Sequence, residues 1–163
     1  MIMAADGNAV GKPYQPMPSS AVSSPMPPDH PALTPAEVIT GGGWHPRYAR
    51  VLAIASDGDY GFALIDGNGD GGELEAETWM WDHGTWSGDG SSGAGPLGNL
   101  GPVRTGGHIG NAYFAYGSAP GRQTITIGFD GHHHQVPVSR DGVWAFIKIR
   151  TDPDGHEFPS PAI

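Results

Sequence analysis

Short runs of apolar residues, separated by turn signals about every eight to twelve residues, fill the chain from Trp44 onward. Hairpin turns are predicted at Ser56-Asp57-Gly58-Asp59 and at Arg140-Asp141-Gly142, because these residues favour tight reversals. Seven or so short strands over about 110 residues indicate an antiparallel β-sandwich, immunoglobulin-like in size. The seven predicted strands are residues 48–55, 60–65, 74–81, 111–116, 123–129, 135–139 and 143–149, with one more at 85–86 if that pair counts as a strand.

The alternation within these runs indicates which strands have one buried face and which have two. Ile125, Ile127 and Phe129 share one face of their strand, with polar threonines between them. Residues 143–149 are apolar on both faces as far as Lys148. We therefore expect this last strand to be central in the domain.

The first 43 residues contain half of the 16 prolines and little that could form a core. Such sequence favours extended, polyproline-like conformations. Residues 1–43 are therefore predicted to be an arm, either a disordered tail or an arm along a neighbouring subunit. Within it, Thr34-Pro35-Ala36-Glu37 has the residues of a capping box, so a short helical turn is expected near residues 35–40. Residues 44–163 are predicted to form the β-sandwich domain, in which the Gly-, Ser- and Pro-rich stretch 87–107 is expected to be a long surface loop.

Charge and composition narrow the classes of partner. The net charge is −9, with 17 acidic and 8 basic residues, whereas nucleic-acid binding needs a basic face, so no nucleic acid is expected. The absence of cysteine excludes disulfides and thiol chemistry. No apolar run is long enough to cross a membrane, and the N-terminus lacks the basic and apolar regions of a signal peptide. We expect no membrane partner and a protein that is cytoplasmic or assembled into a larger particle.

The sharpest chemical pattern is the segment 66–77, Asp-Gly-Asn-Gly-Asp-Gly-Gly-Glu-Leu-Glu-Ala-Glu. It has the spacing of a calcium loop, in which alternate side chains converge on the ion and the glycine at Gly71 permits a sharp turn. The local charge favours a cation, because the residues between Val51 and Val103 include nine acids and no Lys or Arg. The predicted Ca²⁺ ligands are Asp66, Asn68, Asp70, Glu77 and the backbone oxygen of Gly72.

This segment resembles EF-hand calcium loops and the Asp-rich loops of integrin-type propeller repeats. The resemblance covers about twelve residues and implies a bound Ca²⁺. It departs from the EF-hand at Glu73, where a hydrophobic residue is usual, and in its flanks, which are predicted strands. The same residues also suit a plain turn, because Asn, Asp and Gly tolerate positive φ. Both alternatives stay open.

The tryptophans suggest a second candidate surface. In a regular strand Glu75, Glu77, Trp79 and Trp81 share one face. Either these indoles are exposed and form, with Trp86, an aromatic platform for a sugar or a protein, or a bulge turns them into the core. The bulged version is favoured because large aromatic side chains are mostly buried.

Histidines are clustered at His132-His133-His134, after Asp130-Gly131. Consecutive residues of a strand point to opposite faces, so at most His132 and His134 could share a metal ion. An exposed Asp-Gly hairpin with polar tips is the favoured interpretation.

Gly43-Trp44-His45, Leu64-Ile65-Asp66 and Gly142-Val143-Trp144-Ala145 together resemble small β-rich proteins of high-GC Gram-positive bacteria, a group with no assigned activity. The resemblance supports the fold class. The sequence predicts a non-enzymatic binding or structural assembly module, ordered by Ca²⁺ if the loop binds it, with a protein partner or further copies of the chain engaged through the arm. The alternative is a carbohydrate-binding module or a small sugar-active hydrolase that uses the carboxylates of residues 57–77 beside Trp79 and Trp81.

Overall fold

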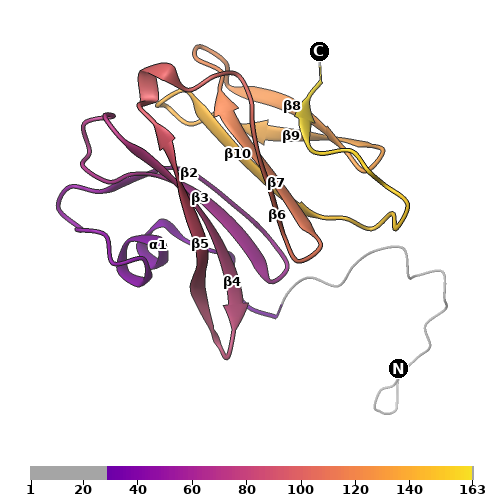
Figure 1. The fold of residues 1–163 in the computed structure, drawn as a ribbon, viewed down its shortest axis with the longest axis horizontal. Helices are drawn as coiled ribbons and strands as arrows, with labels where there is room; N and C mark the ends of the chain where they lie inside the picture. Colours follow the sequence, from indigo (N-terminus) through magenta and orange to yellow (C-terminus); the bar gives the residue numbers. More distant parts are fainter. Residues whose placement is uncertain (1–28, 163) are drawn as a thin grey trace, which may run out of the picture.

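A computed structural model describes residues 29–162, so most of the predicted N-terminal arm lies outside the described residues. This range forms one α-helix, one 3₁₀ turn and ten strands (Figure 1). The elements are α1 (Pro35–Gly41), β2 (Arg50–Asp57), β3 (Tyr60–Asp66), β4 (Leu74–Asp82), β5 (Thr85–Gly95), η2 (Leu97–Asn99), β6 (Arg104–Ile109), β7 (Ala112–Ser118), β8 (Thr124–Phe129), β9 (His132–Pro137), β10 (Val143–Ile149) and β11 (Ser160–Pro161). Residues 29–162 contain no helix with the length and apolar character needed to cross a membrane.

The strands form three antiparallel sheets that pack in series (Figure 1). The first sheet has the order β2-β3-β4-β5, the second β10-β7-β6 and the third β11-β8-β9. One apolar cluster lies between the first and second sheets, and another lies between the second and third. The prediction of an all-β, antiparallel, sandwich-like fold is confirmed, with a third sheet added to the expected two.

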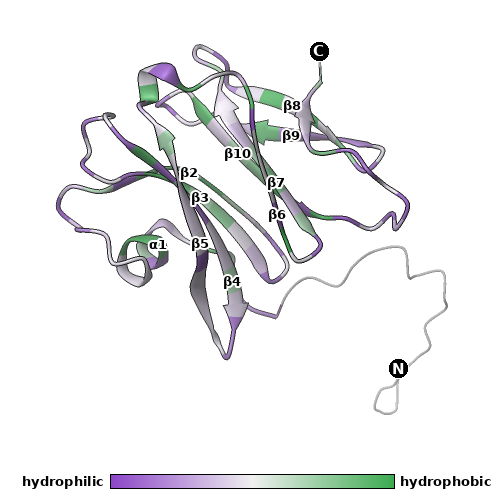
Figure 2. Ribbon diagram, viewed as in Figure 1, coloured by the Kyte–Doolittle hydropathy of each residue, from purple (hydrophilic) through white to green (hydrophobic). Residues whose placement is uncertain are grey.

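The second sheet is covered on both faces, and β10 shows why. Val143, Ala145 and Ile147 pack toward the first sheet, whereas Trp144 and Phe146 pack toward β8 and β9. Figure 2 shows the apolar character along β10. The two-sided apolar pattern of residues 143–149 thus has the predicted meaning of a strand buried on both faces. Laterally, however, β10 is the edge of its sheet.

The outer face of the first sheet is covered by residues 29–49, here called the outer layer. Leu33 and Val38 of this layer pack with Ile65, Trp79 and Trp86 in a third apolar cluster. The helix α1 begins with the predicted capping box: the Thr34 hydroxyl accepts the Glu37 N–H, and the Glu37 carboxylate accepts the Thr34 N–H. Residues 29–43 therefore pack as part of the β domain.

The stretch 87–107 is not a long surface loop, which corrects the prediction. Most of it belongs to β5, an edge strand that pairs along the whole of β4, and to β6. Serines and glycines fill β5 and are mostly exposed, so it lacks the apolar alternation that would reveal a strand. Figure 2 shows β5 as a pale ribbon beside greener strands. Two bulges place their extra residues, Asp89 and Ala94, in β5, so β4 keeps a regular alternation.

The other predicted strands lie close to the observed ones. β2, β3, β4, β7, β8 and β10 begin and end within two residues of the predicted bounds, whereas β9 begins three residues earlier than expected. The turn between β8 and β9 has positive φ at Asp130 and Gly131, as expected for an Asp-Gly hairpin.

Candidate functional site

An apolar groove of about 450 Å³ lies where β2, β9 and β10 meet. Each of these strands is the lateral edge of a different sheet, so three sheet edges converge on it. Edge strands carry backbone N–H and C=O groups that can pair with another strand, and binding pockets of proteins commonly have volumes of about 300–1,000 Å³. The groove therefore combines apolar walls with strand edges. Its apolar lining includes Val51, Ala53, Ile54, Ala55, Val136, Pro137, Val138, Val143, Ala145, Phe146 and Ile147.

Charged pairs link β2 to β10 and to the turn before it. The Asp57 carboxylate accepts the backbone N–H of Ile149 at 2.8 Å and lies 3.8 Å from the Lys148 ammonium. Arg50, at the opposite end of β2, lies 3.4 Å from the carboxylate of Asp141. Because these side chains are partly exposed, each ion pair contributes about 1 kcal/mol or less. Their main effect is to fix how β2 lies against β10, and so to set the shape of the groove.

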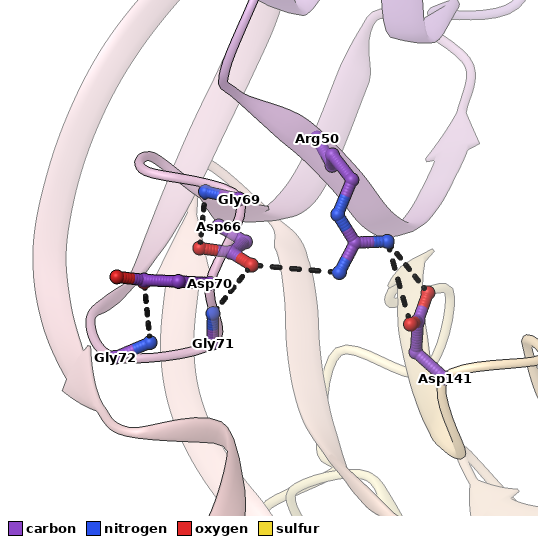
Figure 3. A network of polar contacts seen from close by, with 7 residues as sticks. All are labelled: Arg50, Asp66, Gly69, Asp70, Gly71, Gly72 and Asp141. Carbon is purple, nitrogen blue, oxygen red and sulfur yellow. Dashed lines mark hydrogen bonds and ion pairs between the residues drawn. The ribbon is translucent and has the colours of Figure 1, made fainter.

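The acidic loop after β3 is organised by the polar contacts of Asp66 (Figure 3). The side chain of Asp66 is fully buried. One carboxylate oxygen accepts the N–H of Gly69 at 2.9 Å, and the other accepts the N–H of Gly71 at 2.8 Å. The same carboxylate lies 3.5 Å from Arg50, which also contacts Asp141. Asp66 thus closes the loop and holds the guanidinium that joins β2 to the turn before β10.

The predicted calcium ligands have separate partners in this structure. Both oxygens of Asp66 accept backbone N–H groups, and Asp70 accepts the N–H of Gly72. Asn68 is exposed, and Glu77 accepts two indole N–H groups. Across residues 29–162, no three His, Asp or Glu side chains gather into a group that could hold a metal ion. Calcium binding stays a prediction of the sequence, and from this arrangement it would need new positions for the Asp66 and Glu77 carboxylates.

Glu77 lies beneath the outer layer, between two tryptophans. One of its oxygens accepts the indole N–H of Trp79 and the other accepts that of Trp44, each at 3.0 Å. Burial raises the pKa of Glu77, the two indole hydrogen bonds oppose this effect, and the charge of Glu75 adds to it. The carboxylate therefore bridges β4 and the outer layer.

The tryptophans of β4 and β5 face the outer layer. Trp79 is fully buried and Trp86 is 5% exposed, with its indole N–H donated to the backbone oxygen of Pro31 at 3.1 Å. Trp81 is half-buried and stacks on His30 with 4.2 Å between ring centroids. Trp79 and Trp81 therefore share one face of β4 with Glu77, as predicted for a regular strand. This face is not exposed, and no bulge in β4 turns it. It does not present an exposed aromatic platform, because residues 29–49 cover it.

The groove was missed in the sequence because its walls come from segments far apart in the chain. The available signal was Val136-Pro137-Val138, since proline within a strand run is typical of a sheet edge.

Two buried polar atoms of the groove wall, His134 Nε2 and Ser139 Oγ, have no hydrogen-bond partner within the described part of the chain. Burial lowers the pKa of His134, and the charge of Lys148 acts in the same direction. His134 is thus half-buried at the groove, not part of an exposed tip.

No family model, no curated protein and no solved structure matches this chain. Its function is therefore inferred from the geometry and chemistry of the groove and of the polar network beside it.

Proposed function

We propose that this protein is a non-enzymatic binding or assembly module whose groove holds an extended, apolar segment of polypeptide. The observation that supports this most directly is the convergence of three strand edges on one apolar groove. An extended chain in this position can hydrogen-bond to a strand edge while its alternate side chains enter the apolar space.

The lining of the groove favours a polypeptide over a sugar or a nucleotide. Its walls are largely aliphatic, and its charged groups, Asp57 and Lys148, lie 3.8 Å from each other. His134 Nε2 and Ser139 Oγ, which find no partner among residues 29–162, suit the donors and acceptors of a peptide backbone, because an unpaired buried polar group costs about 1–3 kcal/mol. Nucleotide binding would need cations free to meet phosphate.

A displayed library of linear peptides, selected against the full-length protein, tests this proposal. We expect the selected peptides to be apolar and extended. Added to isotope-labelled protein, they should shift the NMR signals of β2, β9 and β10.

Two single substitutions provide the matched comparison. Pro137→Glu places a charge at an exposed position of the groove wall, and Pro153→Glu places the same charge at an exposed position outside it. We expect at least tenfold weaker binding for the first and unchanged binding for the second. Peptides that shift signals on another surface, or equal effects of the two substitutions, would contradict the proposal, as would a failure to select any peptide when the groove holds no segment of the same chain.

A further inference from the structure

We infer that the occupant of the groove is a segment of the same chain, Pro25-Met26-Pro27, an inference that rests on the proposed function. The tripeptide Pro-Met-Pro occurs twice before the described residues, at 16–18 and at 25–27, each time beside a Ser-Ser pair. Both copies precede the point at which the described chain begins, at Asp29.

The described chain begins beside one end of the groove. His30 Nε2 lies 2.8 Å from the carboxylate of Asp59, and the backbone N–H of Leu33 donates to Ser56 Oγ at 3.4 Å. Ser56 and Asp57 both line the groove. The point at which the preceding segment joins the described chain therefore lies next to the mouth of the groove.

The tether favours the nearer copy. At about 3.1 Å per residue in an extended proline-rich chain, Met26 can lie about 9 Å from Asp29, and Met17 about 37 Å. The part of the groove that follows β2 from Val51 to Asp57 is about 20 Å long. Met26 can therefore lie within the groove, whereas the longer connection to Met17 exceeds its length. A short tether gives an effective concentration in the millimolar range, so weak contacts are enough for occupancy within one chain.

The chemistry of Pro-Met-Pro matches the groove. In an extended chain the backbone groups of alternate residues point to the same side, so Met26 can present its N–H and C=O to a strand edge while the two prolines, which have no N–H, point their backbone away. The flexible thioether side chain adapts to irregular apolar space. Pro28 has no N–H to offer the same edge, so pairing ends there, next to the anchored His30.

A spin label in the full-length protein tests this inference directly. The natural chain has no cysteine, so Ser24→Cys provides a single attachment site. In dilute protein we expect the label to broaden the methyl signals of Val51, Ile54, Val136 and Val138, all of which line the groove. Adding Met26→Asp should markedly reduce this broadening, measured against the chemically reduced, diamagnetic sample. The substituted residue lies outside the described fold, so this variant tests docking without removing a core side chain.

Met17→Asp is the matched control, because it makes the same change in the same tripeptide farther from the tether. It should leave the broadening unchanged. The inference is overturned if the label does not affect the groove, if Met17→Asp is as disruptive as Met26→Asp, or if broadening occurs only between molecules in a mixture of spin-labelled and isotope-labelled chains. If the label leaves the groove unaffected but selected peptides still bind there, the inference fails and the proposed function stands. If neither the label nor any peptide reaches the groove, both fail.

Discussion

Replacing Asp66 with alanine removes a fully buried carboxylate from the loop that joins β3 to β4. The backbone N–H groups of Gly69 and Gly71 lose their acceptor, and Arg50 loses one of its two carboxylate partners. A matched change in the same loop is Asp70→Ala, because Asp70 is exposed and accepts the N–H of Gly72 alone among the described contacts.

The magnitude follows from these contacts. An unpaired buried N–H costs about 1–3 kcal/mol, and because this loop is half-exposed to water we take about 1 kcal/mol for each of the two groups. The ion pair adds about 1 kcal/mol or less, since the Arg50 side chain is 43% exposed. Asp66→Ala should therefore lower the free energy of unfolding by about 2–3 kcal/mol, and Asp70→Ala by about 1 kcal/mol or less.

Urea denaturation followed by tryptophan fluorescence measures both losses, in EDTA and again in millimolar Ca²⁺ with Mg²⁺ as the control. We expect Asp66→Ala to lower the free energy of unfolding by its full amount even in EDTA. The reason is that the carboxylate stabilises the loop through backbone N–H groups and needs no metal ion to do so. The slope of the free energy of unfolding against urea concentration should be the same for the variants and the natural sequence, since the same surface is exposed on unfolding. Equal, small losses for the two variants in EDTA would refute this reasoning. A calcium-specific stabilisation of the natural sequence that both substitutions abolish would establish the calcium loop instead.

Three further outcomes follow from the described contacts. Gly69→Ala should lower the free energy of unfolding more than Gly43→Ala does in the same urea assay. Both positions have positive φ, which costs alanine about 1–2 kcal/mol. A Cβ at Gly69 would also collide with the backbone oxygen of Tyr48, whereas a Cβ at Gly43 meets nothing within 4 Å. Trp79→Ala should lower the free energy of unfolding by about 3–5 kcal/mol, because the indole is fully buried; a loss below about 1 kcal/mol would contradict this packing. Hydrogen bonds to a backbone oxygen and a carboxylate outweigh burial and raise the pKa of His30, so its contribution to stability should be complete below its usual pKa of 6.5 and be lost as the pH rises through the raised value. Urea midpoints between about pH 5 and 8 should show a fall that His30→Gln removes; an identical pH profile for the two proteins would disprove it.

The sequence could predict the strands in which the pattern of apolar side chains matches the faces that are buried. The run from Val143 to Ile149 has apolar residues on both faces and is buried on both faces. By contrast, β5 is held by its hydrogen bonds to β4, and its exposed serines and glycines carry no hydrophobic signal. A strand of this kind can be recognised only from its hydrogen bonds to the neighbouring strand, and not from its own sequence.

The candidate sites were harder to predict because side-chain direction depends on what lies opposite. The alternation of β4 correctly placed Glu77 and Trp79 on one face, but it could not show that residues far earlier in the chain cover this face. In the same way, the calcium-loop spacing is compatible with a cation or with backbone N–H groups as the partners of Asp66, and this fold supplies the N–H groups. The groove depends on the meeting of three sheet edges, which no single segment of sequence encodes.

The order of the strands has a consequence for how the domain folds. β7 and β10 pair along their whole length, yet the β8–β9 hairpin lies between them in the chain and returns to cover Ala115, Trp144 and Phe146. Two of the three strands of the third sheet, β8 and β9, are thus inserted within a larger hairpin, and they shield the very strands that they interrupt. A chain in which β7 and β10 have paired but the inserted hairpin has not docked would expose the indole of Trp144 to water. Closing the larger hairpin and docking the smaller one therefore stabilise each other, which joins the second and third sheets into one cooperative unit.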